Sequence, residues 1–198
     1  MMWPQPVTLR GTHVVLEPLS RDHADDIREA VADGELWNLW YTAIPAVAGV
    51  DAEIERRLGL QEAGAMLPFV ICTPDGKAVG MTTYVNIDAT NRRLEIGHTF
   101  YRKAVQRGPM NTEAKRLLLG HAFEELDCIA VEFRTHFMNH QSRAAIERLG
   151  AKLDGILRSH KIGKDGMIRD TAVYSILNHE WPTIRQHLTY KLEKPRDA

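Results

Sequence analysis

The order in which strand and helix patterns follow one another constrains the fold of this chain most. Its first half contains strand-like alternation of apolar and polar side chains at residues 7–10, 13–18, 67–73, 78–87 and 93–100. Strands joined by a short turn form antiparallel hairpins, whereas a strand reached through a helix can pair in parallel. We therefore expect an α/β (α+β) fold with a mixed, mostly antiparallel sheet and helices on both faces.

Helix signals complete this order. Ser20 can cap a first helix that ends at Gly34, and Asp51 can cap a second helix that ends before Gly64. The second half of the chain predicts a helix whose apolar face includes residues 114–122, a strand at 129–136, a helix at 141–149, two strands around a turn at 163–166 and a terminal helix from Trp181.

Composition supports one globular domain over residues 1–198, since 44% of the residues are hydrophobic and 26% are charged. The formal net charge of -1 argues against a mainly electrostatic nucleic-acid binder. The two cysteines, Cys72 and Cys128, are too few for a disulfide framework. The sequence contains no signal peptide and no apolar stretch near the ~20 residues of a membrane span, so we expect a cytoplasmic protein without a membrane partner.

The strand at 93–100 leads through a loop into a helix, and such a junction can bind an anion. The first N–H groups of a helix have no partner within it, and the helix dipole adds partial positive charge there. A diphosphate is therefore the favoured ligand. Arg107 and Lys115 could add charge nearby. We expect Gly108 to cap the helix and Pro109 to be its first residue, although Pro109 could also mark a helix start without a ligand. The outward N–H groups would be those of Met110, Asn111 and Thr112.

Three segments carry a recognisable pattern. Residues 106–111 read Gln-Arg-Gly-Pro-Met-Asn, residues 139–142 read Asn-His-Gln-Ser ahead of a helix ending in Leu-Gly-Ala, and residues 165–176 begin Asp-Gly-Met-Ile-Arg-Asp. With the Arg10-Gly11 pair and the run at 16–19 they extend over nearly the whole chain. Together they resemble the GCN5-related N-acetyltransferase (GNAT) superfamily, in particular the branch that acetylates ribosomal-protein N-termini.

In that superfamily the phosphate loop reads Gln/Arg-x-x-Gly-x-Gly/Ala, which Gln106 matches, whereas Pro109 and Asn111 depart from it. Because proline has no N–H, Pro109 could weaken binding of the cofactor. The resemblance implies a sheet of about seven strands that is splayed in the middle, and acetyl-CoA as the co-substrate. It assigns cofactor binding to Thr99, Phe100, Gln106, Arg107, Gly108, Met110, Asn111, Thr112, Asn139 and Ser142.

The resemblance also implies an enzyme, an acyl-CoA-dependent N-acetyltransferase acting on a primary amine by direct attack in a ternary complex. A protein or peptide N-terminal amine is the expected acceptor. Its pKa of ~7.7 to 8.0 is lower than the ~10.4 of a lysine amine, so a weaker base can remove its proton. Two alternatives stay open: acetylation of a small amine such as an antibiotic, a polyamine or an amino acid, and a non-catalytic module of this fold with weakened CoA binding. Monomer and homodimer are both open.

Direct attack needs a neutral amine, a polarised thioester carbonyl and a proton for the leaving thiolate. Glu95 is the first candidate base, acting through an ordered water; a solvated glutamate or a salt bridge with Arg93 is the plainer alternative. His98 is a second candidate base. Ser142 could hydrogen-bond or protonate the thiolate, and it could equally cap the following helix. Asn139 could hydrogen-bond the pantetheine amide or serve as a turn residue.

The candidate acceptor-binding residues are Trp37, Trp40, Tyr84 and Arg169. Large aromatic side chains give apolar contact with a polar handle, although such clusters more often lie in a core. Arg169 could contact a peptide backbone or carboxylate, and an ion pair with Asp170 is the default explanation. No metal is expected, because His136 and His140 straddle a strand end and do not form the helical zinc pattern.

Overall fold

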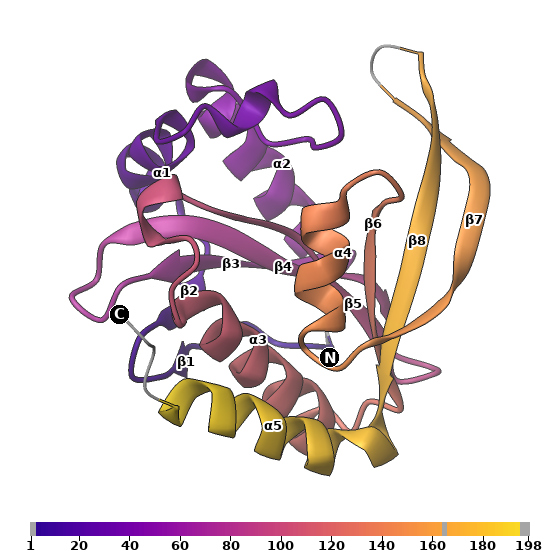
Figure 1. Ribbon diagram of the computed structural model, residues 1–198. Coiled ribbons are helices and arrows are strands. Elements are labelled where there is room, and N and C mark those ends of the chain that lie inside the picture. Colours follow the sequence, from indigo (N-terminus) through magenta and orange to yellow (C-terminus); the bar gives the residue numbers. More distant parts are fainter. Residues whose placement is uncertain (1–2, 164–165, 195–198) are drawn as a thin grey trace.

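The computed structural model describes residues 3–163 and 166–194, and one eight-stranded sheet runs through this part of the chain (Figure 1). The strands lie in the order β1-β2-β3-β4-β5-β6-β8-β7, which confirms the expected mixed, mostly antiparallel sheet. Their bounds are β1 Leu9–Arg10, β2 Val15–Pro18, β3 Met66–Cys72, β4 Ala78–Asp88, β5 Arg93–Tyr101, β6 Ala130–His136, β7 Lys152–Ile162 and β8 Ile168–Leu177.

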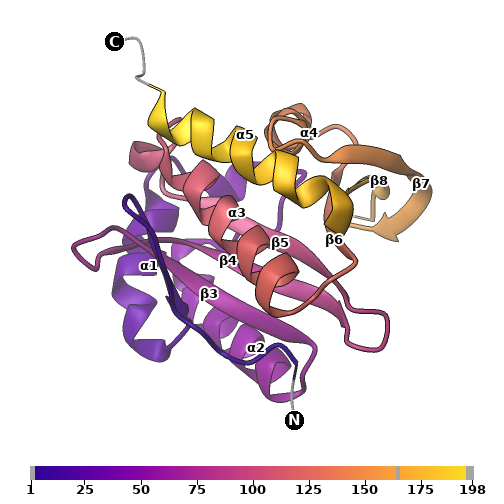
Figure 2. The same ribbon diagram turned by 90° about the horizontal axis from the view of Figure 1, so that it is seen from below.

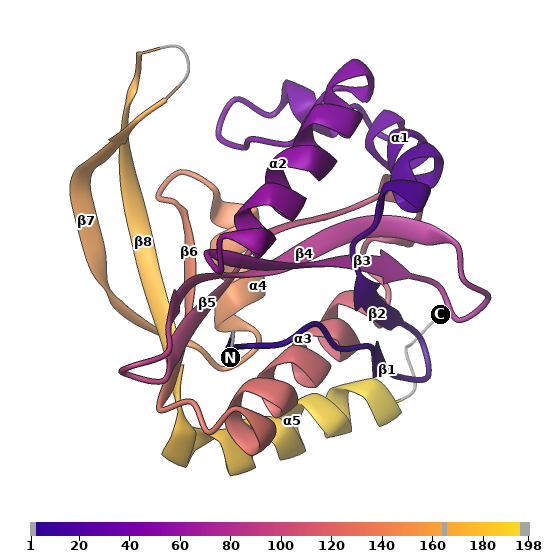
Figure 3. The same ribbon diagram turned by 180° about the vertical axis from the view of Figure 1, so that it is seen from behind.

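Helices cover both faces of the sheet, as expected. The helices α1 (Ala24–Ala32) and α2 (Val50–Glu62) lie on one face, and α3 (Met110–Gly120) and α5 (Trp181–Glu193) lie on the other (Figures 2 and 3). The remaining α-helix, α4 (His140–Glu147), follows β6 (Figure 1). Within the described ranges, no helix is long and apolar enough to cross a bilayer.

Each face of the sheet has its own apolar core. Ile27 of α1 and Ile54 of α2 belong to the first core, and Leu118 of α3 belongs to the second. Successive side chains of a strand point to opposite faces. As a result β4 gives Met81 to the first core and Tyr84 to the second, and most of β4 is buried.

The sheet opens between β5 and β6, its only parallel pair within the described chain. The two strands pair over three positions, ending with Glu95 opposite Glu132, and they run apart beyond that point (Figure 1). We call this point the fork. The splayed sheet that the family resemblance implied is therefore present.

A β-bulge bends β5 just beyond the fork. Thr83 of β4 pairs with Gly97, and Met81 pairs with Phe100, so two residues of β5, His98 and Thr99, occupy the place of one. An extra residue of this kind kinks the strand and increases its twist. His98 adopts a φ of 49°, which a non-glycine residue rarely adopts. The bulge therefore directs β5 away from β6.

Two of the predicted helix starts differ from the structure by one residue or one turn. Ser20 caps a short 3-10 turn, Arg21–His23, that leads into α1. The second helix begins at Val50 with Gly49 as its cap, so the prediction that Asp51 is the cap was wrong. Asp51 lies in the first turn, where a carboxylate also interacts favourably with the helix dipole.

A buried carboxylate fixes the start of α3 to the turn between β1 and β2. Glu113 accepts hydrogen bonds from the backbone N–H groups of Thr12, at 3.0 Å, and His13, at 2.6 Å. Its side chain lies so close to Gly11 that a Cβ there would be 2.5 Å from the carboxylate carbon. Gly11 is therefore required by close approach, and this contact, the Gly11–Glu113 clamp, holds α3 in place.

Candidate functional site

The first turn of α3 presents backbone N–H groups without a partner. The helix begins at Met110 with Pro109 as its cap, so the prediction that Gly108 is the cap was wrong by one residue. The first helical bond runs from the N–H of Glu113 to the carbonyl of Pro109. Among the described residues, the N–H groups of Met110, Asn111 and Thr112 donate no hydrogen bond to an acceptor outside the helix. This arrangement can accept an anion.

The loop before α3 is held by its own polar groups. The Gln106 side chain donates a hydrogen bond to the carbonyl of Tyr101 at 2.9 Å, which ties the loop to the end of β5. Arg107 adopts a φ of 63° and has an exposed side chain. Lys115 is not available at the helix start, because it is buried beneath β4 and β5. The expectation that Lys115 adds charge beside a bound anion was therefore wrong.

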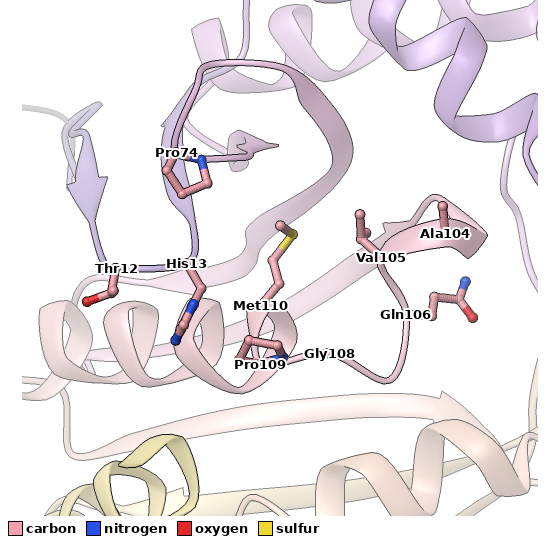
Figure 4. A pocket seen from close by; sticks show the side chains of 9 residues that line it. All are labelled: Thr12, His13, Pro74, Ala104, Val105, Gln106, Gly108, Pro109 and Met110. Carbon is pink, nitrogen blue, oxygen red and sulfur yellow. The ribbon is translucent and has the colours of Figure 1, made fainter. Parts of the chain in front are cut away.

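A pocket of about 310 Å³ adjoins the start of α3 (Figure 4). Its lining comes from the β1–β2 turn, the β3–β4 turn and the loop before α3, and consists of Thr12, His13, Pro74, Ala104, Val105, Gln106, Gly108, Pro109 and Met110. Such a volume lies at the lower end of the range for small-molecule sites, about 300–1,000 Å³. The pocket gives space for part of a ligand next to the free N–H groups.

Glu95 lies at the fork itself. It is only 6% exposed, its carboxylate accepts a hydrogen bond from Asn86 at 2.6 Å, and the guanidinium of Arg134 is 3.6 Å away. Burial raises the pKa of Glu95 above its ordinary value, against the opposing effects of Asn86 and Arg134. Arg93 pairs with Glu132 instead. Glu95 is thus neither a solvated glutamate nor the partner of Arg93, and a raised pKa suits a general base.

Arg57 of α2 supports the bulge from the other side. Its guanidinium donates to the hydroxyl of Thr83 at 2.8 Å and to the carbonyl of His98 at 3.3 Å, and it pairs with Glu53 at 2.7 Å. His98 is an exposed residue, but the protein around its ring and the charge of Arg57 lower the pKa of His98 to about 4. A group with so low a pKa is a weak base near neutral pH. Glu95 is therefore the better candidate.

The start of α4 corrects the expected role of Ser142 in capping. Asn139 is the cap, and its side-chain oxygen accepts the N–H of Ser142 at 3.0 Å. The Ser142 hydroxyl has no hydrogen-bond partner in the part of the chain that the structure covers. Arg143 donates to the hydroxyl of Tyr174 on β8 at 2.9 Å, which fixes the helix against the sheet. The hydroxyl of Ser142 is free to contact a ligand.

The candidate acceptor residues separate into different environments. Trp40 is 64% exposed and its ring meets the His136 ring edge-on at 5.0 Å, so the segment between α1 and α2 reaches the end of β6. Arg169 has a buried Nε without a hydrogen-bond partner among the described residues, and it attracts Glu95 electrostatically. The expected pair between Arg169 and Asp170 is absent from the described ion pairs, since Asp170 binds Arg158 instead.

Three further predicted contact residues use their side chains in packing. Tyr84 is fully buried and donates to the Leu118 carbonyl at 2.6 Å, so the prediction that it binds the acceptor was wrong. Trp37 packs against the core beneath α1 and α2, although it remains partly exposed. Phe100 belongs to the same core, which leaves only its backbone for a ligand. In each case the apolar side chain is used in packing.

Sequence reasoning missed the supporting residues Asn86, Arg134 and Arg57. Only the position of Arg57 is indicated by a pattern in the sequence. Val50, Ile54 and Arg57 recur at helical spacing and form the buried face of α2, so Arg57 occupies a core position on that helix. Asn86 and Arg134 reach Glu95 from other strands, and no spacing along the chain indicates that contact.

Comparisons with known proteins bear on the fold described above. Residues 13–152 match the family model described as an acetyltransferase (GNAT) domain. YdaF of Bacillus subtilis, named provisionally as a ribosomal N-acetyltransferase, is 36% identical over 107 residues. That match spans 54% of this chain and 57% of YdaF, little more than half of that relative's length.

Solved structures extend the likeness to nearly the whole chain. A GCN5-related N-acetyltransferase from Brucella melitensis superposes with a TM-score of 0.85 at 30% identity, covering 96% of this chain and 86% of that one. RimJ of Mycobacterium smegmatis, solved in complex with CoA-disulfide, superposes with a TM-score of 0.78 and covers 96% of this chain and 95% of its own. Its identity of 24% supports a common fold.

Proposed function

This chain belongs to the GNAT acetyltransferase family, and from that premise we propose that it transfers the acetyl group of acetyl-CoA to the N-terminal amine of a protein or peptide. The observation that carries the proposal is the fork, where a buried carboxyl of raised pKa lies where β5 leaves β6. From there β5 continues through its bulge and the loop to the free N–H groups of α3.

The residues at the start of α3 and α4 fit the parts of acetyl-CoA. The N–H groups of Met110, Asn111 and Thr112 would hold the pyrophosphate, and Pro109 removes none of these donors because it precedes them. The side-chain amide of Asn139 keeps its N–H donors for the pantetheine arm while its oxygen caps α4. When bound, acetyl-CoA supplies an acetyl group activated as a thioester.

Glu95 takes the proton of the amine, and Ser142 stabilises the sulfur, which leaves as a thiolate. Glu95 accepts, directly or through one water, the proton that the amine nitrogen loses as it bonds to the acetyl carbon. Ser142 donates a hydrogen bond from its free hydroxyl to the sulfur as the carbon–sulfur bond breaks. The bulge leaves His98 and Thr99 unpaired with β4. A backbone N–H group released in this way can polarise the carbonyl of the thioester.

Charge near the fork favours a peptide over a polyamine. A polyamine or an aminoglycoside is a polycation and needs an acidic cleft. Here Arg134 and Arg169 lie around Glu95, and Trp40 and His136 lie toward the end of β6. Guanidinium and aromatic groups suit the carbonyls, carboxylates and side chains of a peptide. The name of YdaF supports the same acceptor class, and a ribosomal acceptor would place the enzyme in the cytoplasm.

A panel of acceptors, assayed for release of free CoA, tests this proposal. It should include lysine-free peptides with a free N-terminus, the same peptides with a blocked N-terminus, a polyamine and an aminoglycoside. We expect CoA release only with the free peptides, and mass spectrometry should place the acetyl group on the α-amine. Turnover of a small amine with none of the peptides would contradict the assigned acceptor class.

A further inference from the structure

Lys115 is a buried lysine without an acidic partner. Its side chain is 6% exposed, and no described carboxylate lies within 4.0 Å of it. The ammonium nitrogen donates to the hydroxyls of Thr99, at 2.8 Å, and Thr82, at 3.1 Å. Burying a charge without a counter-charge is costly, so this arrangement is not explained by stability alone.

The position of Lys115 relates it to the bulge of β5. Thr99 is one of the two bulged residues, and Thr82 is the β4 residue opposite them. The two hydroxyls are themselves 2.8 Å apart. Thr82 is fully buried, whereas Thr99 is partly exposed, so the set extends from the interior to the bulge. Glu95 and Arg57 lie toward the opposite face of the sheet, the face that α2 covers.

We propose that Lys115 is a positioning residue for acetyl transfer, which acts through the Thr99 hydroxyl to orient the bulge and to bring positive charge beneath it. The inference rests on the proposed function. When the ammonium donates to the Thr99 oxygen, it polarises the Thr99 O–H, whose proton can go to the Gly97 carbonyl, at 3.4 Å, or to the Thr82 hydroxyl, at 2.8 Å. An ammonium has three donors, and two are used here. In a site shielded from water, such a charge favours the negative charge that develops during transfer.

The charge of Lys115 depends on pH. Burial lowers the pKa of Lys115 to about 7. The groups that face it from β4 and β5 are the two threonine hydroxyls. Other titratable groups buried on this side are Tyr84, Tyr101, Tyr174 and Cys128, whose pKa values burial raises, and His121, whose pKa burial lowers, so these groups are neutral near pH 7. The Glu113 carboxylate, buried on α3 itself, accepts hydrogen bonds from the N–H groups of Thr12 and His13. The contribution of Lys115 to the rate should therefore be lost as pH rises through about 7.

The test compares the wild type with Lys115→Met, using acetyl-CoA and a peptide with a free N-terminus. We expect kcat/KM for acetyl-CoA to fall about tenfold at low pH, less than the loss of a direct oxyanion donor. The ratio of the two kcat/KM values should approach one as pH rises, and titration of the acceptor cancels in that ratio. A ratio that is constant with pH would mean a purely structural role and would overturn the inference.

Two matched variants and a binding measurement complete the test. Thr99→Val should reproduce the effect of Lys115→Met, whereas Thr99→Ser, which keeps the hydroxyl, should retain the wild-type profile. Calorimetry of CoA binding should show affinity that weakens as pH rises through about 7 in the wild type and not in Lys115→Met. Equal pH dependence in both proteins would count against the inference. A wild type that binds no CoA would refute the proposed function as well.

Discussion

At the scale of single residues, Glu95 is a buried carboxyl at the fork, and burial raises its pKa. Replacing it by Gln keeps the shape but removes the proton acceptor, so kcat should fall by about 10²–10⁴-fold with little change in CoA affinity. Glu132→Gln is the matched control, because Glu132 lies opposite Glu95 in the sheet and is held by Arg93 and Arg134. Similar losses in both variants would contradict the role of Glu95.

The raised pKa of Glu95 also predicts a change in stability. A carboxyl whose pKa is higher in the folded state binds its proton more tightly there, so its contribution to stability is lost as pH rises through the raised pKa. Above that pH, Glu95→Gln should raise the melting temperature while it lowers the rate. A Gln variant that melts lower than the wild type at pH 8 would show that the ionised carboxylate is stabilising.

Asn139 and Ser142 allow capping and chemistry to be separated. Asn139→Ala removes the cap of α4 and should lower the free energy of unfolding by about 0.5–2 kcal/mol. Ser142→Ala removes a hydroxyl without a partner among the described residues, so it should lower kcat and leave stability nearly unchanged. Chemical denaturation and steady-state kinetics of both variants check this. Equal destabilisation by the two variants would mean that Ser142 has a structural role.

Individual site residues were predictable only where the local pattern determines their position. Glu95 could be identified because its strand leads into the loop before α3. Tyr84 could not be assigned correctly, since β4 is buried on both faces and alternation alone does not show which face meets a ligand. The contact of Lys115 with Thr82 and Thr99 joins three separate elements, so it depends on tertiary packing.

At the scale of elements, the Gly11–Glu113 clamp couples the β1–β2 turn to the start of α3. A Cβ at Gly11 would overlap the Glu113 carboxylate, so Gly11→Ala should lower the free energy of unfolding by about 1–3 kcal/mol and weaken CoA binding. Gly59→Ala in α2 is the control, because nothing lies within 4 Å of a Cβ there. That change should stabilise the helix by about 0.5–1 kcal/mol. Equal effects in denaturation experiments would contradict the clamp.

Element order and type followed from the sequence more closely than element ends did. Turn residues at 74–77 and the alternation on each side predicted the β3–β4 hairpin. The cap of α2 was displaced by two residues and that of α3 by one, because several residues near a helix start can satisfy its first N–H groups. The β5 bulge was not predicted, since its support comes from Arg57 on a distant helix.

At the scale of the whole molecule, segments from the two halves of the chain meet near the end of β6. The contact between Trp40 and His136 joins the segment after α1 to the strand beyond the fork. Trp40→Ala should raise KM for a peptide acceptor several-fold without changing CoA affinity. Trp37→Ala should act mainly on stability, because Trp37 packs against the core of α1 and α2. Steady-state kinetics and thermal melts distinguish the two. The reverse pattern would place the acceptor elsewhere.

In the proposed reaction, the fork and the free N–H groups of α3 together hold acetyl-CoA. The most direct measurement is a thermal-shift titration of the wild-type chain with acetyl-CoA. A ligand that binds only the folded state adds ~2.7 kcal/mol of stability at about 100 times its dissociation constant, so the melting temperature should rise with concentration. An unchanged melting temperature at millimolar acetyl-CoA would show that this site does not bind the co-substrate.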